Sequence, residues 1–147
     1  MKHTIDFKIV TPEKIVYQDE ISQATVPTAS GEITVLANHS PLVSVLKTGE
    51  MIVKKQQKEN GRKFEDFYFA IFGGIVEVRP GSQVIVLADR AERAEEIDLE
   101  RANEARKRAE KALSEKDKLD DRQYAKLQAI LEKEINRINI RRRRFNK

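Results

Sequence analysis

Residues 72–102 read FGGIVEVRPGSQVIVLADRAERAEEIDLERA, and two kinds of structure meet inside them. Val76 and Val78 alternate with charged residues, as in a strand with one buried face. Residues 84–87 form a continuous apolar run, as in a strand buried on both faces. After Asp89 glycine and proline disappear, which favours an uninterrupted helix. The stretch therefore predicts a change from β structure to helix close to residue 89.

The rest of the chain keeps the same division. All six glycines and all four prolines precede Asp89, and residues 90–147 contain neither. Residues 1–89 carry 10 Lys and Arg against 11 Asp and Glu, whereas residues 90–147 carry 18 against 13. The second part therefore holds the positive charge of this +4 chain. We expect two domains, 1–89 and 90–147.

The first domain shows the pattern of short antiparallel strands. Ile5, Phe7 and Ile9 share one face of a period-two pattern, and similar runs of Val, Ile, Phe and Thr follow between turn signals. Short strands separated by such turns are typical of a sandwich or a barrel. About 89 residues are just enough for a small closed β core.

The second domain shows the period of an amphipathic helix, twice. One helix face gathers Ala94, Ile97, Ala102, Ala105, Ala109, Ala112 and Leu113. The other gathers Tyr124, Leu127, Ile130, Leu131, Ile135 and Ile138. We expect an α+β chain in which an antiparallel β-sandwich is followed by a two-helix hairpin. These two faces can bury only a small apolar area against each other. We therefore expect a hairpin that can open or change partners.

Capping signals bound the two helices. Residues 114–119 are the expected turn, and Asp120 with Gln123 has the spacing of a capping box for the second helix. The first helix has two possible starts, because Asp89 and Asp98 both suit an N-cap. The sequence leaves this choice open.

No catalytic constellation is present. The absence of cysteine excludes disulfides, thiolate metal sites and cysteine nucleophiles, and neither G-x-x-x-x-G-K-[ST] nor G-x-G-x-x-G occurs. His39 could act as a general base, but no nucleophile pairs with it, so we favour a structural role in which its side chain forms a hydrogen bond with the loop backbone. We expect no enzyme activity, no metal and no required cofactor. No apolar run reaches the ~20 residues of a membrane span, and no leader pattern opens the chain, so we expect it to stay where it is made.

Four consecutive arginines, residues 141–144, are a strong local charge. They suit contact with nucleic acid, acidic lipid or an acidic protein, and equally a solvated helix end that the helix dipole favours. A basic nucleic-acid-binding adaptor is therefore the alternative function. The mixed signs of residues 90–120 and the 6% aromatic content count against it, and we expect no nucleic-acid partner.

Three stretches resemble one known family. Residues 30–42 read SGEITVLANHSPL, residues 72–88 read FGGIVEVRPGSQVIVLA, and residues 91–102 read AERAEEIDLERA. In this order, over nearly the whole chain, they resemble the epsilon chain of the F-type ATP synthase, the counterpart of the mitochondrial delta chain. Thr34, Ala37 and Asn38 depart from the family, which often has Gly, Pro and Gly there, and this affects the expected loop shape.

The resemblance implies a noncatalytic subunit of the rotor's central stalk. It implies a ten-stranded β-sandwich that grips the gamma subunit and rests on the c-ring, with Glu32 and His39 in the contact region. It also implies a peripheral position on the cytoplasmic face of the cell membrane, held there only through the complex.

The third stretch resembles the family's nucleotide motif [I/L]-D-x-x-R-A, which implies ATP as a regulatory ligand. The matching residues are Glu92, Ile97, Asp98, Arg101, Ala102, Arg108, Lys133 and Arg137. Asp98 would hold the adenine edge, and the cations would surround the phosphates. Lys133 stands at a family arginine and lacks its bidentate fork. The alternative stays open that Asp98 only caps a helix and the arginines are surface charge.

The resemblance also implies control of ATP hydrolysis by the hairpin. Folded with ATP, the hairpin would rest on the sandwich; extended, its basic face would meet acidic segments of the beta subunits and inhibit hydrolysis. That face comprises Arg122, Lys126, Lys133, Arg137, Arg141, Arg142, Arg143 and Arg144.

Overall fold

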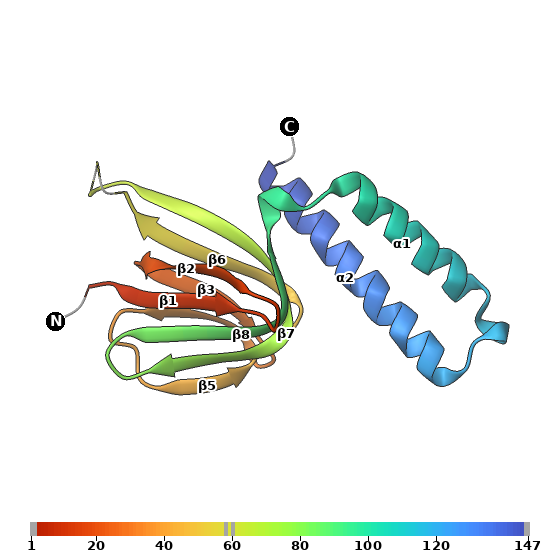
Figure 1. Ribbon diagram of the computed structural model, residues 1–147, viewed down its shortest axis with the longest axis horizontal. Helices are drawn as coiled ribbons and strands as arrows, with labels where there is room; N and C mark the ends of the chain where they lie inside the picture. Colours follow the sequence, from red (N-terminus) through yellow and green to blue (C-terminus); the bar gives the residue numbers. More distant parts are fainter. Residues whose placement is uncertain (1–2, 58, 60, 146–147) are drawn as a thin grey trace. The chain divides into compact units, whose positions relative to one another are not determined.

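The chain forms two compact units, Met1–Arg93 and Ala94–Lys147 (Figure 1). The computed structural model describes residues 3–145 except 58 and 60. The first unit is built of strands and the second of helices, which confirms the predicted α+β fold. Strand β8 continues past Asp89 to Arg93, so residues 90–93 belong to the sheet and not to the hairpin.

Eight strands make up the first unit over its described residues. They are β1 (Ile5–Val10), β2 (Ile15–Ile21), β3 (Gln23–Thr28), β4 (Gly31–Leu36), β5 (Leu42–Val45), β6 (Gly49–Gln56), β7 (Phe64–Arg79) and β8 (Gln83–Arg93). Neighbouring strands pair antiparallel, apart from the parallel pair of β1 and β8. The strand order is β2-β1-β8-β7-β6-β3-β4, with β5 also paired to β7.

The two long strands turn this sheet into two layers. The first half of β8 and the second half of β7 lie with β1, β2 and β5, and we call this set layer 1. The other halves lie with β6, β3 and β4, and we call this set layer 2. β7 bends at Gly73 and Gly74, whose φ angles are +72° and +116°. Each layer thus has five strand segments, so eight strands supply the ten that the resemblance implies.

One apolar core lies between the layers. Phe7 and Val86 come from layer 1, Val53 and Phe69 come from layer 2, and all four are at most 1% exposed. The expectation that residues 84–87 are buried on both faces is wrong. Val84 and Val86 point into the core, whereas the side chain of Leu87 is 42% exposed.

The second unit is a helical hairpin. It consists of η1 (Ala94–Glu96), α1 (Leu99–Ser114), η2 (Lys116–Lys118) and α2 (Asp121–Phe145). The carboxylate of Asp98 accepts a hydrogen bond of 3.1 Å from the backbone N–H of Arg101, so Asp98 and not Asp89 caps α1. Asp120 and Gln123 exchange hydrogen bonds of 2.7 and 3.1 Å, which confirms the predicted capping box.

The buried face of α2 differs from the expected one. Ile138 is buried as predicted, but Tyr124 and Ile135 are 38% and 40% exposed. Glu134 is only 4% exposed. By i, i+4 spacing Glu134 shares the face of Ile138, so a carboxylate occupies a position where the period predicts an apolar residue. No helix of the described chain is long and apolar enough to cross a membrane.

Candidate functional site

A row of apolar side chains crosses the outer surface of layer 1. The strand register aligns five residues, one from each strand, and we call them the apolar row: Ile15, Val10, Leu87, Ile75 and Val45. The exposed fractions of Ile15, Leu87, Ile75 and Val45 are 53, 42, 36 and 59%. A row this continuous is unusual on a surface that meets only water, and it indicates a contact with another protein.

A bulge completes the apolar row at the edge strand. Ile9 pairs with Tyr17, but the next pair is Val10 with Ile15, so Val16 is the extra residue of β2. An extra residue in one strand reverses the alternation of its side chains, so that the residues on the two sides of the bulge are out of phase. Ile15 therefore joins Val10 on the outer face instead of pointing into the core.

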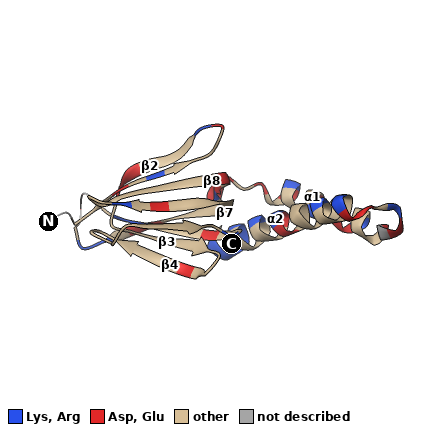
Figure 2. Cartoon of the chain, turned by 90° about the horizontal axis from the view of Figure 1, so that it is seen from below, with Lys and Arg blue, Asp and Glu red and all other residues tan. Residues whose placement is uncertain are grey.

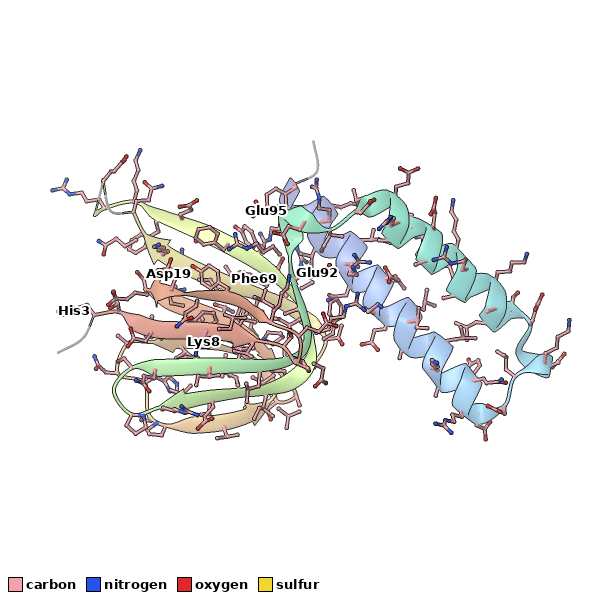
Figure 3. The ribbon with its side chains drawn as sticks, viewed as in Figure 1. His3, Lys8, Asp19, Phe69, Glu92 and Glu95 are labelled. Carbon is pink, nitrogen blue, oxygen red and sulfur yellow. The ribbon has the colours of Figure 1, made fainter. Side chains whose placement is uncertain are left out.

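The same surface becomes polar away from the bend of β7. Lys8 on β1 (Figure 3) lies beside Ile85, which pairs with Glu77. Arg79 donates to the Glu77 carboxylate from Nε at 3.0 Å and from Nη2 at 3.3 Å, and these contacts raise the pKa of Arg79. The charged end of the surface thus carries its own ion pair, whereas four of the five residues of the apolar row are at least 36% exposed.

Glu32 and His39 lie at opposite ends of β4. Glu32 follows the turn at Gly31 and is exposed. His39 follows the strand, and its Nδ1 lies 2.7 Å from the backbone oxygen of Ser40, as interpreted from the sequence. The four residue steps from Glu32 to Leu36 alone span about 13 Å, so these two residues do not form one local cluster.

The loop around His39 holds a residue of positive φ at Asn38, where the family often has glycine. Asn38 has φ +66°, a left-handed conformation that asparagine tolerates better than most residues. The Ser82 Oγ accepts a 2.8 Å hydrogen bond from the backbone N–H of Asn38 and lies 3.3 Å from its Oδ1. Thr34 forms a cross-strand hydroxyl pair with Thr25 at 3.1 Å, which agrees with a strand position.

The nucleotide-motif residues at the start of α1 are partly engaged in capping. Asp98 caps the helix, and its Oδ2 lies 4.0 Å from Nε of Arg101, whose side chain is 84% exposed. Ile97 and Ala102 are buried. Glu92 lies near the end of β8 (Figure 3), in the other unit from these residues.

On α2 the structure brings Lys133 and Arg137 to one carboxylate. Nζ of Lys133 lies 3.6 Å from Oε1 of Glu134, and Nη1 of Arg137 lies 2.8 Å from Oε2. Arg108 is exposed on α1, seven residues from Arg101 and on the same face. The residues expected from the sequence to bind ATP do not include Glu134. Its i, i+3 spacing to Arg137 is the one feature of the sequence that indicates their ion pair.

Acidic residues interrupt the basic surface of the hairpin. In Figure 2 segments coloured for acidic and for basic residues alternate along both helices. Arg122 and Lys126 are exposed near the start of α2. Arg141 donates to the backbone oxygen of Phe145 at 3.0 Å and stacks on its ring, so the arginine run is part of the helix. The described residues contain no cluster of His, Asp and Glu suited to a metal ion.

Comparison with known families matches both units in turn. Residues 4–94 match the family described as ATP synthase, Delta/Epsilon chain, beta-sandwich domain, and residues 95–141 match its long alpha-helix domain. The chain belongs to the ATP synthase delta/epsilon family. Members of this family are structural and regulatory subunits of the stalk of ATP synthase, and the catalytic subunit is a different one.

Individual relatives match this chain over more than nine tenths of its length. The chain is 44% identical to an ATP synthase epsilon chain of Desulforamulus reducens over 138 residues, which cover 94% of this chain and 97% of that one. It is 36% identical to the epsilon chain of Bacillus pumilus over 137 residues, 93% and 96% of the two chains.

Solved structures share the fold of the delta/epsilon family at low identity. A chain of the Euglena gracilis mitochondrial ATP synthase, solved as OSCP/F1/c-ring, matches with a TM-score of 0.72 and 22% identity, over 90% of this chain and 78% of that chain. A chain of the Tetrahymena thermophila mitochondrial central stalk and c-ring matches with a TM-score of 0.50 and 17% identity, over 69% and 71%.

Proposed function

We propose that this chain is a rotor subunit of the central stalk and docks on the gamma subunit through the apolar row. The single observation that carries this is the row itself, five aligned apolar residues on the outer face of layer 1. Family membership supplies the partner, because a stalk subunit must grip the shaft with which it turns. Burying such a row contributes roughly 25 cal/mol for each Å² of apolar surface.

The proposal extends to the other members of the stalk. The turn that carries Glu32 and the loop that carries His39 project from opposite ends of β4. An exposed acid suits polar c-ring loops, and the hydrogen-bonded His39 loop suits a rigid neighbouring contact. The chain would lie on the cytoplasmic face of the cell membrane and reach the membrane only through the complex.

The hairpin would regulate hydrolysis. We infer that it inhibits backward rotation when extended, with its basic face against acidic segments of the beta subunits, and that bound ATP favours the folded hairpin. The capped start of α1 and the paired cations of α2 support a nucleotide site. ATP shifts this equilibrium only by the difference between its affinities for the two states. The nucleic-acid alternative has no support from the family comparisons.

Co-purification tests the docking surface. Purified gamma is mixed with the full chain and with Ile75→Lys or Leu87→Lys, each of which places a charge in the apolar row. We expect gamma to bind the wild type at least ten-fold more tightly, because a buried unpaired charge is costly.

The matched control is Phe64→Lys, which changes a 50% exposed aromatic of the same sandwich outside the apolar row. It should bind gamma like the wild type. Equal binding by the two row variants, with their fold intact by circular dichroism, would show that gamma docks elsewhere.

A further inference from the structure

Glu134 on α2 is a charged residue that the proposed function does not use. Its side chain is 5% exposed and lies on the face of α2 that also carries Ile138. A carboxylate in such a position is tolerated only when cations and hydrogen bonds compensate its lost hydration. An apolar residue at this position would pack in the hairpin at a lower free-energy cost. Packing alone therefore does not account for the acid.

The compensation comes from two of the cations proposed for phosphate. Arg137 contacts one oxygen of Glu134 at 2.8 Å and Lys133 contacts the other at 3.6 Å. The side chains of Arg137 and Lys133 are 15% and 25% exposed, so both remain within reach of a ligand from solution. Both are also the proposed partners of the ATP phosphates on this helix. Carboxylate and phosphate oxygens compete for the same guanidinium and ammonium donors.

We propose that Glu134 is a built-in competing anion that sets how tightly the hairpin binds a polyphosphate. This inference rests on the proposed nucleotide site. To bind there, a phosphate must displace the carboxylate from Arg137 and Lys133 or share these cations with it. With Glu134 the three side chains carry a net charge of +1, and without it +2. Glu134 thus weakens ATP binding, so that only a high nucleotide concentration holds the hairpin folded.

The substitution Glu134→Gln tests the proposal in the full-length chain. Glutamine keeps the shape and can still accept from Arg137, but it removes the negative charge. Isothermal titration with MgATP, and separately with tripolyphosphate, measures the dissociation constant at low salt. We expect about ten-fold tighter binding of both ligands, and a smaller gain at high salt, because screening weakens the charge effect.

Glu132→Gln is the matched control. It removes the same charge two positions away on the same helix, from an exposed residue. Binding to this variant should equal binding to the wild type within about two-fold. In the double variant Glu134→Gln with Arg137→Ala, the gain should disappear.

The outcomes separate this inference from the proposed function. Equal or weaker binding of both ligands to Glu134→Gln, with helix content unchanged by circular dichroism, overturns the role of Glu134 while leaving an ATP site in place. Tighter tripolyphosphate binding without any ATP binding supports Glu134 and overturns the nucleotide gate. Absence of binding by every variant at millimolar ligand overturns both.

A second variant covers loss of helix. If Glu134→Gln unfolds the hairpin, Glu134→Asp replaces it. Aspartate keeps the charge but withdraws the carboxylate by one methylene from Lys133 and Arg137, so binding should still tighten, by a few-fold. Unchanged binding by a folded Glu134→Asp would then overturn the proposal.

Discussion

Asn38 and Ser82 fix the conformation of the loop that carries His39. Asn38 and Ser82 both have positive φ, +66° and +57°, and they are hydrogen-bonded to each other across 44 positions of sequence. Ser82 also accepts a hydrogen bond of 2.9 Å from Asp6 through its backbone oxygen. The His39 loop is therefore tied to the turn between β7 and β8 and to β1.

The first prediction concerns Asn38. Both Asn38→Ala and Asn38→Gly lose the side-chain contact with Ser82, but only alanine keeps a Cβ at positive φ. We expect alanine to be less stable than glycine by about 1 kcal/mol, which is the cost of the left-handed conformation. Urea denaturation of the two variants measures the difference. A glycine variant no more stable than the alanine variant would contradict the strain argument.

The second prediction concerns Tyr17, a core side chain 7% exposed. Burial, and next the charge of Asp19, raises the pKa of the Tyr17 phenol from 10.0 to about 12. The folded protein then holds this proton more tightly than the unfolded chain does. The associated stability is fully present below pH 10 and is lost as the pH rises toward 12. We expect the urea midpoint to fall across this window.

Tyr17→Phe checks this assignment. The Tyr17 hydroxyl makes no hydrogen bond of good geometry with the described residues and lies close to Asp19, so its removal should change stability at pH 7 by less than about 1 kcal/mol. The variant should lose less stability than the wild type between pH 10 and 12. In the wild type, absorbance near 295 nm should show one of the three tyrosines ionising last. An unchanged alkaline profile in Tyr17→Phe would assign the effect to another group.

Among the elements, the bend of β7 decides how the sandwich closes. At Gly74 a side chain would collide with the backbone oxygen of Leu87 and lie 2.8 Å from Cα of Ala88. The backbones of β7 and β8 are therefore in close contact at the point where both strands pass between the two layers. No flexible side chain is available there to move aside.

The third prediction follows from that contact. Gly74→Ala should destabilise the sandwich by more than about 3 kcal/mol, because backbone must shift. Gly81→Ala is the control: its φ is also positive, +82°, but no atom lies within 4 Å of the new Cβ. It should cost only about 1–2 kcal/mol. Similar losses in thermal melts of both variants would show that φ alone, and not the collision, makes glycine necessary.

At the scale of the whole molecule, the end of β8 fixes where the hairpin can be removed. Residues 90–93 pair with Phe69–Phe72, and the guanidinium of Arg93 lies 5.5 and 5.9 Å from the ring centres of Tyr17 and Phe69. Each such cation–π contact is worth about 0.5–2 kcal/mol. The sandwich therefore includes Arg93 as a stabilising residue.

The fourth prediction compares two truncations. A chain that ends at Arg93 should fold, bind gamma and join the complex, and that complex should hydrolyse ATP faster than the complete one. A chain that ends at Asp89 should be less stable by about 2 kcal/mol or more, because it loses the strand pairs and the Arg93 contacts. Hydrolysis and thermal unfolding measure the two effects. No gain in hydrolysis with the Arg93 truncation would remove the inhibitory role of the hairpin.

The apolar row and Glu134 show where reasoning from sequence failed. The apolar neighbours of Leu87 predict a core position for it. Ile15 lies two residues before the core residue Tyr17, and the period-two pattern predicts a core position for it too. Leu87 is exposed because it lies on the outer face of its strand, and Ile15 is exposed because a bulge reverses its face. Glu134 reads as solvent-facing because it is charged, yet Lys133 and Arg137 make its burial tolerable.

The sequence by itself determined the division into sandwich and hairpin, the capping box at Asp120 and the family. These features depend on glycine, proline, capping pairs and periods that act over a few neighbouring residues. The tertiary structure alone decided that Asp98 starts α1, that β8 ends at Arg93, and which apolar side chains face outward. Those features depend on which strand or helix lies alongside, and such partners are far apart in the chain and leave no local signal.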